Sequence, residues 1–116
     1  MGCSHEDLND GVRIVRLSGR LDTEEINRIS LPFTVAATSG SKSVVVDLSA
    51  VDFLASLGVG AIVSAARTVQ NRQGRFALCG ANPQVLSTLE RTQIPKVIPT
   101  FREAAEARLA VQLPAS

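Results

Sequence analysis

Few residues in this chain combine a reactive type with a useful spacing. The single histidine, His5, stands in a polar stretch at the start, where we expect a mobile leader. A general acid or base needs a fixed position within hydrogen-bond reach of its substrate, which such a leader does not provide. Asp22, Asp47 and Asp52 have no His or Cys companions at the spacing of metal ligands. We therefore expect neither an enzyme nor a metal site.

Gly58-Val59-Gly60 is the only stretch with the beginnings of a nucleotide-binding loop. In the dinucleotide fingerprint a third glycine would fall at position 63, but that position holds Val63, within an apolar helical pattern. No lysine follows a glycine-rich loop in the Walker arrangement. We expect no cofactor, and we interpret these glycines as allowing close packing.

Ser56 is the remaining candidate, because it stands where a buried strand and a short loop lead into a helix. Helix N-termini carry unpaired N–H groups and a partial positive charge, so a phosphate on Ser56 would be well placed. Serine is also a preferred N-cap residue, and on spacing alone a simple capping role is favoured. The residues by themselves leave both interpretations open.

The elements that must position Ser56 follow from hydrophobic periodicity and from turn and cap signals. The order strand, helix, strand, helix, strand, helix, helix predicts an α/β layer fold. In the first half of the chain we expect a leader or edge strand over 1–9, a turn at Asp10-Gly11, a half-buried strand over 12–17 ended by Ser18-Gly19, and a helix from Thr23. That helix has Asp22 as N-cap, Glu25 as capping-box partner and a kink or restart at Pro32.

In the second half we expect a strand covered on both faces over 43–48, a helix from Ser56 to about 73, a strand over 76–80 and a helix starting at Asn82-Pro83. A terminal helix over 101–113 follows, and its apolar face holds Ala104, Ala105, Leu109 and Leu113.

Composition limits the classes of partner. The 116 residues include 45% hydrophobic and 20% charged side chains with a net charge of +1, which is typical of one globular domain. Without a basic excess, Trp or Tyr, the chain is a poor candidate for binding nucleic acid. The longest apolar runs are too short to cross a bilayer, and the start lacks the apolar region of a signal peptide. Two cysteines, Cys3 and Cys79, form no disulfide framework, so we expect a cytoplasmic protein that does not insert into membranes.

Four stretches, in order, resemble the STAS domain, the family of bacterial anti-sigma factor antagonists and of the cytoplasmic domains of sulphate transporters. The resemblance extends from Val12 to about Leu113 and includes the helix start at Asn82-Pro83. It implies one STAS domain over residues 1–116, with a mixed sheet of about four strands and helices packed against it. The stretches are Val12–Asp22, Val44–Ser49, Phe53–Ile62 and Gly74–Cys79.

The same resemblance implies a function in bacterial transcription regulation. Such a module binds an anti-sigma factor with a GHKL-type kinase fold, which holds the ATP, and phosphorylation of the module reverses the binding. Ser56 matches the phosphoacceptor position and Gly58 the glycine that follows in the family motif. Ala55 replaces the family Asp, and Leu57 replaces a second hydroxyl residue. The expected partner-binding residues are Asp22, Ala55, Ser56, Leu57, Gly58, Gly60, Ala61 and Ser64.

Because Ala55 and Leu57 depart from the family motif, other functions stay possible. Without the Asp, Ser56 could be phosphorylated slowly or not at all, which would give a permanently active antagonist. Leu57 could form an apolar contact patch or pack into the domain's own core. The alternative function is a stand-alone STAS subunit of an ABC-type membrane transport assembly, without phosphorylation. A nucleotide-binding role near Asp47 and Ser56 has the least support.

Overall fold

The fold is built on one mixed five-stranded sheet with the strand order β1-β2-β3-β4-β5. The computed structural model describes residues 2–8, 11–39 and 43–112. β1 is antiparallel to β2, and every later neighbour is parallel. The strands are β1 (Cys3–Asp7), β2 (Val12–Leu21), β3 (Ser43–Leu54), β4 (Phe76–Cys79) and β5 (Thr100–Phe101). The expected mixed α/β architecture is confirmed, and the two-residue β5 is a fifth strand that the sequence did not indicate.

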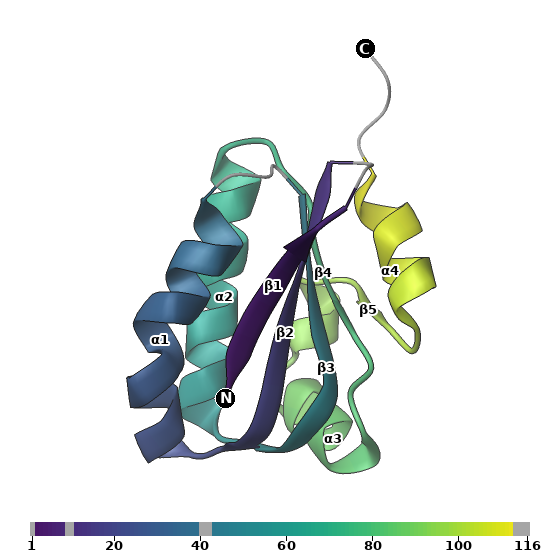
Figure 1. Cartoon of the computed structure of the whole chain (residues 1–116). Helices are drawn as coiled ribbons and strands as arrows, with labels where there is room; N and C mark the ends of the chain where they lie inside the picture. Colours follow the sequence, from purple (N-terminus) through teal and green to yellow (C-terminus); the bar gives the residue numbers. More distant parts are fainter. Residues whose placement is uncertain (1, 9–10, 40–42, 113–116) are drawn as a thin grey trace.

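Helices cover both faces of this sheet and create two separate cores. α1 (Thr23–Thr38) and α2 (Ser56–Asn71) lie side by side on one face, while α4 (Ala104–Val111) lies on the other (Figure 1). α3 (Pro83–Arg91) adds Val85 and Leu89 to the larger core under α1 and α2. A 3-10 turn, Ile94–Lys96, precedes β5. The smaller core, between the sheet and α4, contains Val12, Ile14, Val45, Ala77, Cys79, Ala107 and Val111.

The second core explains why β2 is not the half-buried strand we expected. Residues 12 to 15 are all buried, because Val12 and Ile14 face α4 while Val15 faces α1. Arg13 is buried among them at 9% exposure. Its guanidinium pairs with Asp7 of β1 at 2.6 Å and donates to the backbone oxygens of Ala36 and Ser39 at 3.0 and 2.9 Å. Arg13 therefore ties the last turn of α1 to the sheet.

Two helices begin where we expected, and the predicted N-cap of the first, Asp22, is confirmed. The Asp22 carboxylate accepts from the Glu25 backbone N–H at 3.0 Å, and Asn82 Oδ1 accepts from the Val85 N–H at 2.8 Å. The Glu25 side chain accepts from Arg28 rather than completing a capping box. α1 also continues through Pro32 as one helix, so the expected restart is wrong.

The segment before the turn forms the edge strand β1, one of the two forms we expected for it, and not a mobile leader; Asp10 of the predicted turn lies outside the described residues. Three other boundaries differ from the expectations. β2 runs beyond Gly19 to Leu21, and β3 runs beyond Leu48 to Leu54. At the C-terminal end, Phe101 belongs to β5, and the following helix buries Ala107 and Val111 while Leu109 is exposed. Leu113 lies outside the described residues. No helix in the described part of the chain is long and apolar enough to span a membrane.

Candidate partner-binding site at the start of α2

The site lies at the edge of the sheet where β2 and β3 end together. These strands are parallel and pair Leu21 with Leu54, so the residues that follow them are neighbours. Asp22 alone separates β2 from α1, and Ala55 alone separates β3 from α2. The Ala55 N–H donates to the Leu21 carbonyl oxygen at 2.9 Å. The first turns of two helices, each with unpaired N–H groups, therefore begin side by side.

Ser56 is exposed and is the first residue of α2, not its N-cap. The N-cap is Ala55, whose backbone is extended and whose methyl side chain accepts no hydrogen bond. The capping role that we considered for Ser56 is therefore wrong. Its hydroxyl stands at the surface, beside the positive end of the helix dipole, where an added phosphate would be electrostatically favoured.

The exposed side of α2 carries half of the eight predicted partner-binding residues, Ser56 among them. Leu57 is 46% exposed, and Gly60 and Ser64 follow it on the same face at helical spacing. Of the two interpretations that the sequence left open for Leu57, a surface contact patch and packing into the domain's own core, the structure therefore favours the surface. Ala61 is half-buried and turns partly toward the core. Asp22 is half-buried at the start of α1.

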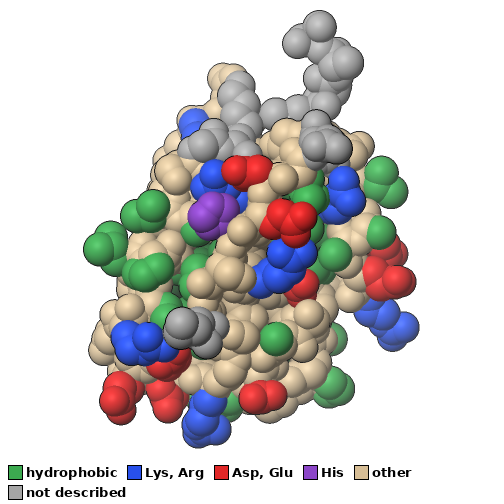
Figure 2. Space-filling model, viewed as in Figure 1, with side chains coloured by type: hydrophobic (Ala, Val, Ile, Leu, Met, Phe, Trp, Pro, Cys, Tyr) green, Lys and Arg blue, Asp and Glu red, His purple; other side chains and the backbone are tan. Residues whose placement is uncertain are grey.

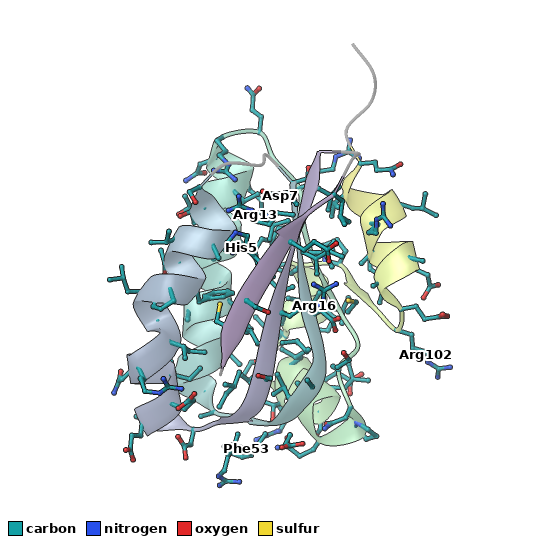
Figure 3. The ribbon with its side chains drawn as sticks, in the orientation of Figure 1. His5, Asp7, Arg13, Arg16, Phe53 and Arg102 are labelled. Carbon is teal, nitrogen blue, oxygen red and sulfur yellow. The ribbon has the colours of Figure 1, made fainter. Side chains whose placement is uncertain are left out.

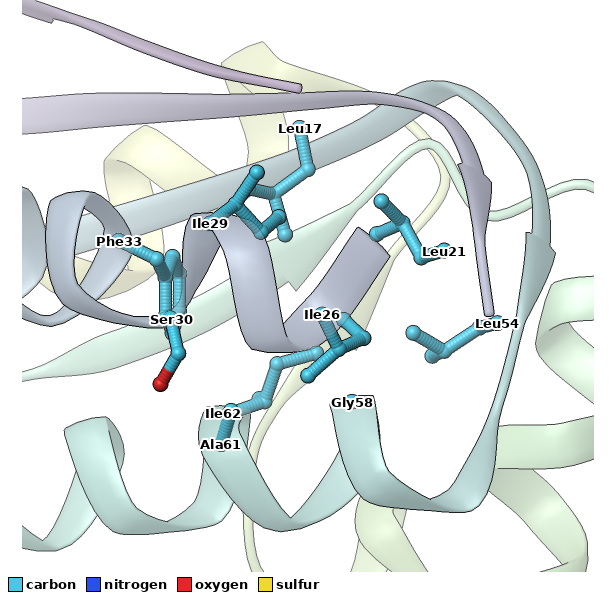
Figure 4. Close-up of a pocket in the computed structure, with 10 residues that line it drawn as sticks. All are labelled: Leu17, Leu21, Ile26, Ile29, Ser30, Phe33, Leu54, Gly58, Ala61 and Ile62. Atoms are coloured by element: carbon cyan, nitrogen blue, oxygen red, sulfur yellow. The ribbon is translucent and has the colours of Figure 1, made fainter. Parts of the chain in front are cut away.

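Gly58 is buried between α1 and β3 and does not form part of this exposed face. A Cβ placed on Gly58 would lie 2.6 Å from a methyl of Leu54 and 2.9 Å from a methyl of Ile26. Figure 4 shows these two side chains on either side of Gly58, around a small apolar cavity of about 10 Å³. Gly58 therefore lets α2 approach α1 closely and fixes the position of Ser56 and Leu57. Its contribution to the site is packing.

Arg20 and Phe53 complete the site, although the sequence did not single them out. The Arg20 guanidinium carbon lies 4.4 Å from the centre of the Phe53 ring, and Arg20 Nε lies 3.8 Å from a carboxylate oxygen of Asp22. Phe53 lies at the end of the molecule where α2 begins (Figure 3). Both side chains depend on irregular pairing of β2 with β3, which shifts register around Gly19, a residue with φ of 88°. Because we expected β2 to end at Gly19, Arg20 was assigned to a connection.

The hydrogen bond from Arg28 lowers the pKa of Glu25, which lies in the first turn of α1 beside Asp22. The cysteines with a shifted pKa lie away from this site. Burial raises the pKa of the Cys79 thiol to about 12, and the charge of Asp47 adds to the effect. Asp47 accepts a hydrogen bond from the Ser49 N–H at 2.9 Å, a contact within β3. His5 lies in β1, so no imidazole reaches Ser56. Within residues 2–8, 11–39 and 43–112, no cluster of three or more His, Cys, Asp or Glu could hold a metal ion.

Comparison with known proteins places this geometry in a family. The sequence profile of the STAS domain matches residues 7–107. The anti-sigma F factor antagonist of Paenibacillus polymyxa is 29% identical over 99 residues, which are 84% of this chain and 84% of that protein.

Two solved structures have the same fold. An anti-sigma factor antagonist from Mycobacterium paratuberculosis superposes with a TM-score of 0.86 at 24% identity, covering 96% of this chain and 93% of the other. An anti-sigma-factor antagonist (STAS) domain protein from Planctomyces limnophilus superposes with a TM-score of 0.82 at 27% identity, covering 95% of this chain and 98% of the other. The profile match spans most of the sequence and includes every strand and helix of the Ser56 site, so this chain belongs to the STAS domain family.

Proposed function

We propose that this chain is an anti-sigma factor antagonist that binds an anti-sigma factor with a GHKL-type kinase fold. The observation that carries the proposal is the exposed Ser56 at the first position of α2. The names of its relatives support the same function. The exposed face of α2 from Leu57 to Ser64, together with Asp22, Arg20 and Phe53, is the docking surface. The chain acts in the cytoplasm as a binding module and not as an enzyme.

Phosphorylation of Ser56 is the proposed switch. A phosphate adds about −1.5 to −2 charges to a surface that must lose water when the partner docks. Leu57 and Gly60 beside it are neutral, and the negative charge of Asp22 near the same edge is already opposed by the Arg20 guanidinium at 3.8 Å. Phosphorylated Ser56 therefore weakens docking, and the unphosphorylated form releases the sigma factor by occupying the anti-sigma factor.

Ala55 sets how readily the switch is used. An Asp at this N-cap position could orient the serine or help a kinase to recognise it, and Ala55 does neither. We propose that Ser56 is a slow substrate, so that most of the protein stays in the binding-competent form. Restoring the acidic group with Ala55→Asp should speed phosphorylation, whereas Ala55→Asn supplies a cap of the same shape without the charge.

The test uses purified GHKL-type anti-sigma factors from the source genome and isothermal titration. Wild type and Ser56→Ala should bind one of them, and Ser56→Asp should bind it roughly tenfold or more weakly. Thr68→Asp is the matched control, because it adds the same charge to an exposed position of α2 about 18 Å further along the helix. With ATP and magnesium present, mass spectrometry should find phosphate on Ser56.

Three outcomes contradict the proposal. If Ser56→Asp binds as tightly as wild type, the serine is not the switch. If no anti-sigma factor binds wild type while permease or ATPase subunits of an ABC-type transporter bind every variant equally, the chain is a transport subunit. Heat on titration with ATP or GTP alone would instead indicate a nucleotide-binding protein.

A further inference from the structure

A groove lies along α2, on the flank of the helix that faces away from α1. Ala61 marks the α1 side, because it lines the small apolar cavity together with Ser30 and Phe33. On the other flank α2 meets the segment that follows the 3-10 turn, and the groove between them measures about 210 Å³. The surface of α2 is therefore hollowed beyond the Ser56 site. The residues that line the groove are Val63, Ala66, Arg67, Gln70, Val97 and Ile98.

Val97 is held outward by the anchoring of its neighbours. Ile94 and Ile98 are buried in the larger core, whereas Val97 is 63% exposed. The N–H groups of Val97 and Ile98 both donate to the Ile94 carbonyl oxygen, at 2.9 and 2.8 Å. Val97 therefore cannot turn inward without breaking these contacts. A partner that fills the groove meets a preorganised apolar side chain and removes it from water, which favours binding.

The charged side chains nearest to Val97 on these two elements are basic. Arg67 is the only charged residue of α2, and Lys96 is the only one from Thr92 to Pro99. Both are exposed, and neither has an ion-pair partner among the residues that the structure describes. Figure 2 shows a different arrangement over β1, where acidic and basic side chains lie beside one another, as in the pair of Glu6 and Arg16 at 3.1 Å. The groove therefore favours an occupant that brings negative charge.

The groove also continues the proposed docking surface. The exposed face of α2 runs from Gly60 through Val63 to Arg67 at helical spacing. The stretch from Leu57 to Ser64 is only about 10 Å long. A stable protein–protein interface covers about 800 Å² on each partner, a patch roughly 30 Å across. Arg67 lies about 15 Å from Leu57 along the helix, so one partner of ordinary size covers both the Ser56 site and the groove.

We propose that the groove is a second contact for the anti-sigma factor, an inference that rests on the proposed function. An apolar side chain of the partner fills the groove and packs against Val63 and Val97. A neighbouring acidic side chain of the partner pairs with Arg67. Thr68, the site of the control substitution above, lies outside the groove, because it is seven residues from Ala61 and shares the flank toward α1.

Isothermal titration with the anti-sigma factor that binds wild type tests the apolar contact. Val97→Glu should raise Kd roughly tenfold or more, because docking would remove water from a charge that has no partner in the groove. Leu109→Glu is the matched control, since Leu109 is 70% exposed on α4, on the other face of the sheet, and this variant should bind like wild type. Thermal melting followed by circular dichroism checks that both variants are folded.

Arg67→Glu tests the charge and does not depend on the outcome at Val97. It should raise Kd roughly tenfold, and its difference from wild type should shrink as salt is added, because ions screen exposed charge pairs. Arg102→Glu makes the same change in net charge at an exposed residue beside α4 and should bind like wild type (Figure 3). Equal losses of affinity in Arg67→Glu and Arg102→Glu would show that only the net charge matters.

The results distinguish a failure of this inference from a failure of the proposed function. If wild type binds and Ser56→Asp weakens binding, while Val97→Glu and Arg67→Glu bind like their controls, the proposed function holds and the inferred second contact is wrong. If no anti-sigma factor binds wild type, the proposed function is wrong and the inference fails with it. Selective losses in Val97→Glu and Arg67→Glu support the second contact.

Discussion

Gly58 and Gly60 of α2 provide a matched pair that tests how the Ser56 site is held in place. Alanine at either position gains about 1 kcal/mol of helix preference over glycine. At Gly60 the new methyl would meet nothing within 4 Å, so Gly60→Ala should keep that gain. At Gly58 the methyl would lie 2.6 Å from Leu54 and 2.9 Å from Ile26, inside ordinary van der Waals contact.

The cost at Gly58 follows from the packing around it. The clashing atoms are terminal methyls of Leu54 and Ile26, which are buried at 1% and 5% exposure, so each side chain must change its rotamer among packed neighbours, beside a cavity of about 10 Å³. Overpacking of this kind costs roughly 1–3 kcal/mol. Because the helix-propensity gain cancels between the two variants, this overpacking cost is the whole difference between them.

Thermal unfolding followed by circular dichroism measures that difference directly. At roughly 4 °C per kcal/mol for a domain of this size, Gly58→Ala should melt about 4–12 °C below Gly60→Ala. Gly58→Ala should also weaken partner binding, because α2 must move away from α1 and carry Ser56 with it. Equal melting temperatures for the two variants would refute the reasoning, since they would show that the α1–α2 contact adapts without cost.

Three further predictions concern stability and reactivity. Ala55→Asp and Ala55→Asn should each raise the free energy of unfolding by about 0.5–2 kcal/mol, measured in urea, because each supplies the side-chain acceptor that the N-cap of α2 lacks. Arg13→Met should lower it by about 2–4 kcal/mol, because two carbonyl oxygens of α1 and the Asp7 carboxylate lose their donor; a loss below about 0.5 kcal/mol would contradict the anchoring role. The Cys79 thiol, with a pKa of about 12, stays protonated in the folded state above pH 9 while the unfolded chain ionises. Between pH 9 and 10 the free energy of unfolding of the wild type should therefore fall, relative to that of Cys79→Ala, by up to about 1.4 kcal/mol per pH unit. If the two proteins show the same dependence of unfolding free energy on pH, this prediction is wrong.

Local signals in the sequence were sufficient for the elements on which the site depends. Asp22 and Asn82 act as N-caps because their short side chains accept from an N–H three residues on, a contact that needs no distant partner. The helical period from Val59 to Val69 and the β-branched run of β3 are likewise local patterns, and both elements formed there. The position of Ser56 at the start of α2 could therefore be predicted.

The misassigned residues are those whose structure depends on distant neighbours. Arg13 looks like a solvent-facing strand residue until the last turn of α1 places two carbonyl oxygens beside it. Arg20 looks like a turn residue until β3 continues past Leu48 and offers Phe53 as its partner. The two residues of β5 are a strand only because β4 lies alongside them. No local pattern contains this information, because it arises from tertiary pairing.

The packing beneath Ser56 determines what kind of switch this surface can be. Ser56 follows a one-residue connection whose backbone is tied to β2 by the Ala55 to Leu21 hydrogen bond, and Gly58 is wedged between Ile26 and Leu54 two residues later. A phosphate on the exposed hydroxyl therefore changes the charge of the surface without entering the core. The helix dipole favours that charge, so modification gives no reason for α2 to unwind. Under the proposed function, phosphorylation of Ser56 would therefore act at the contact itself, by making docking of the partner on an otherwise unchanged face unfavourable.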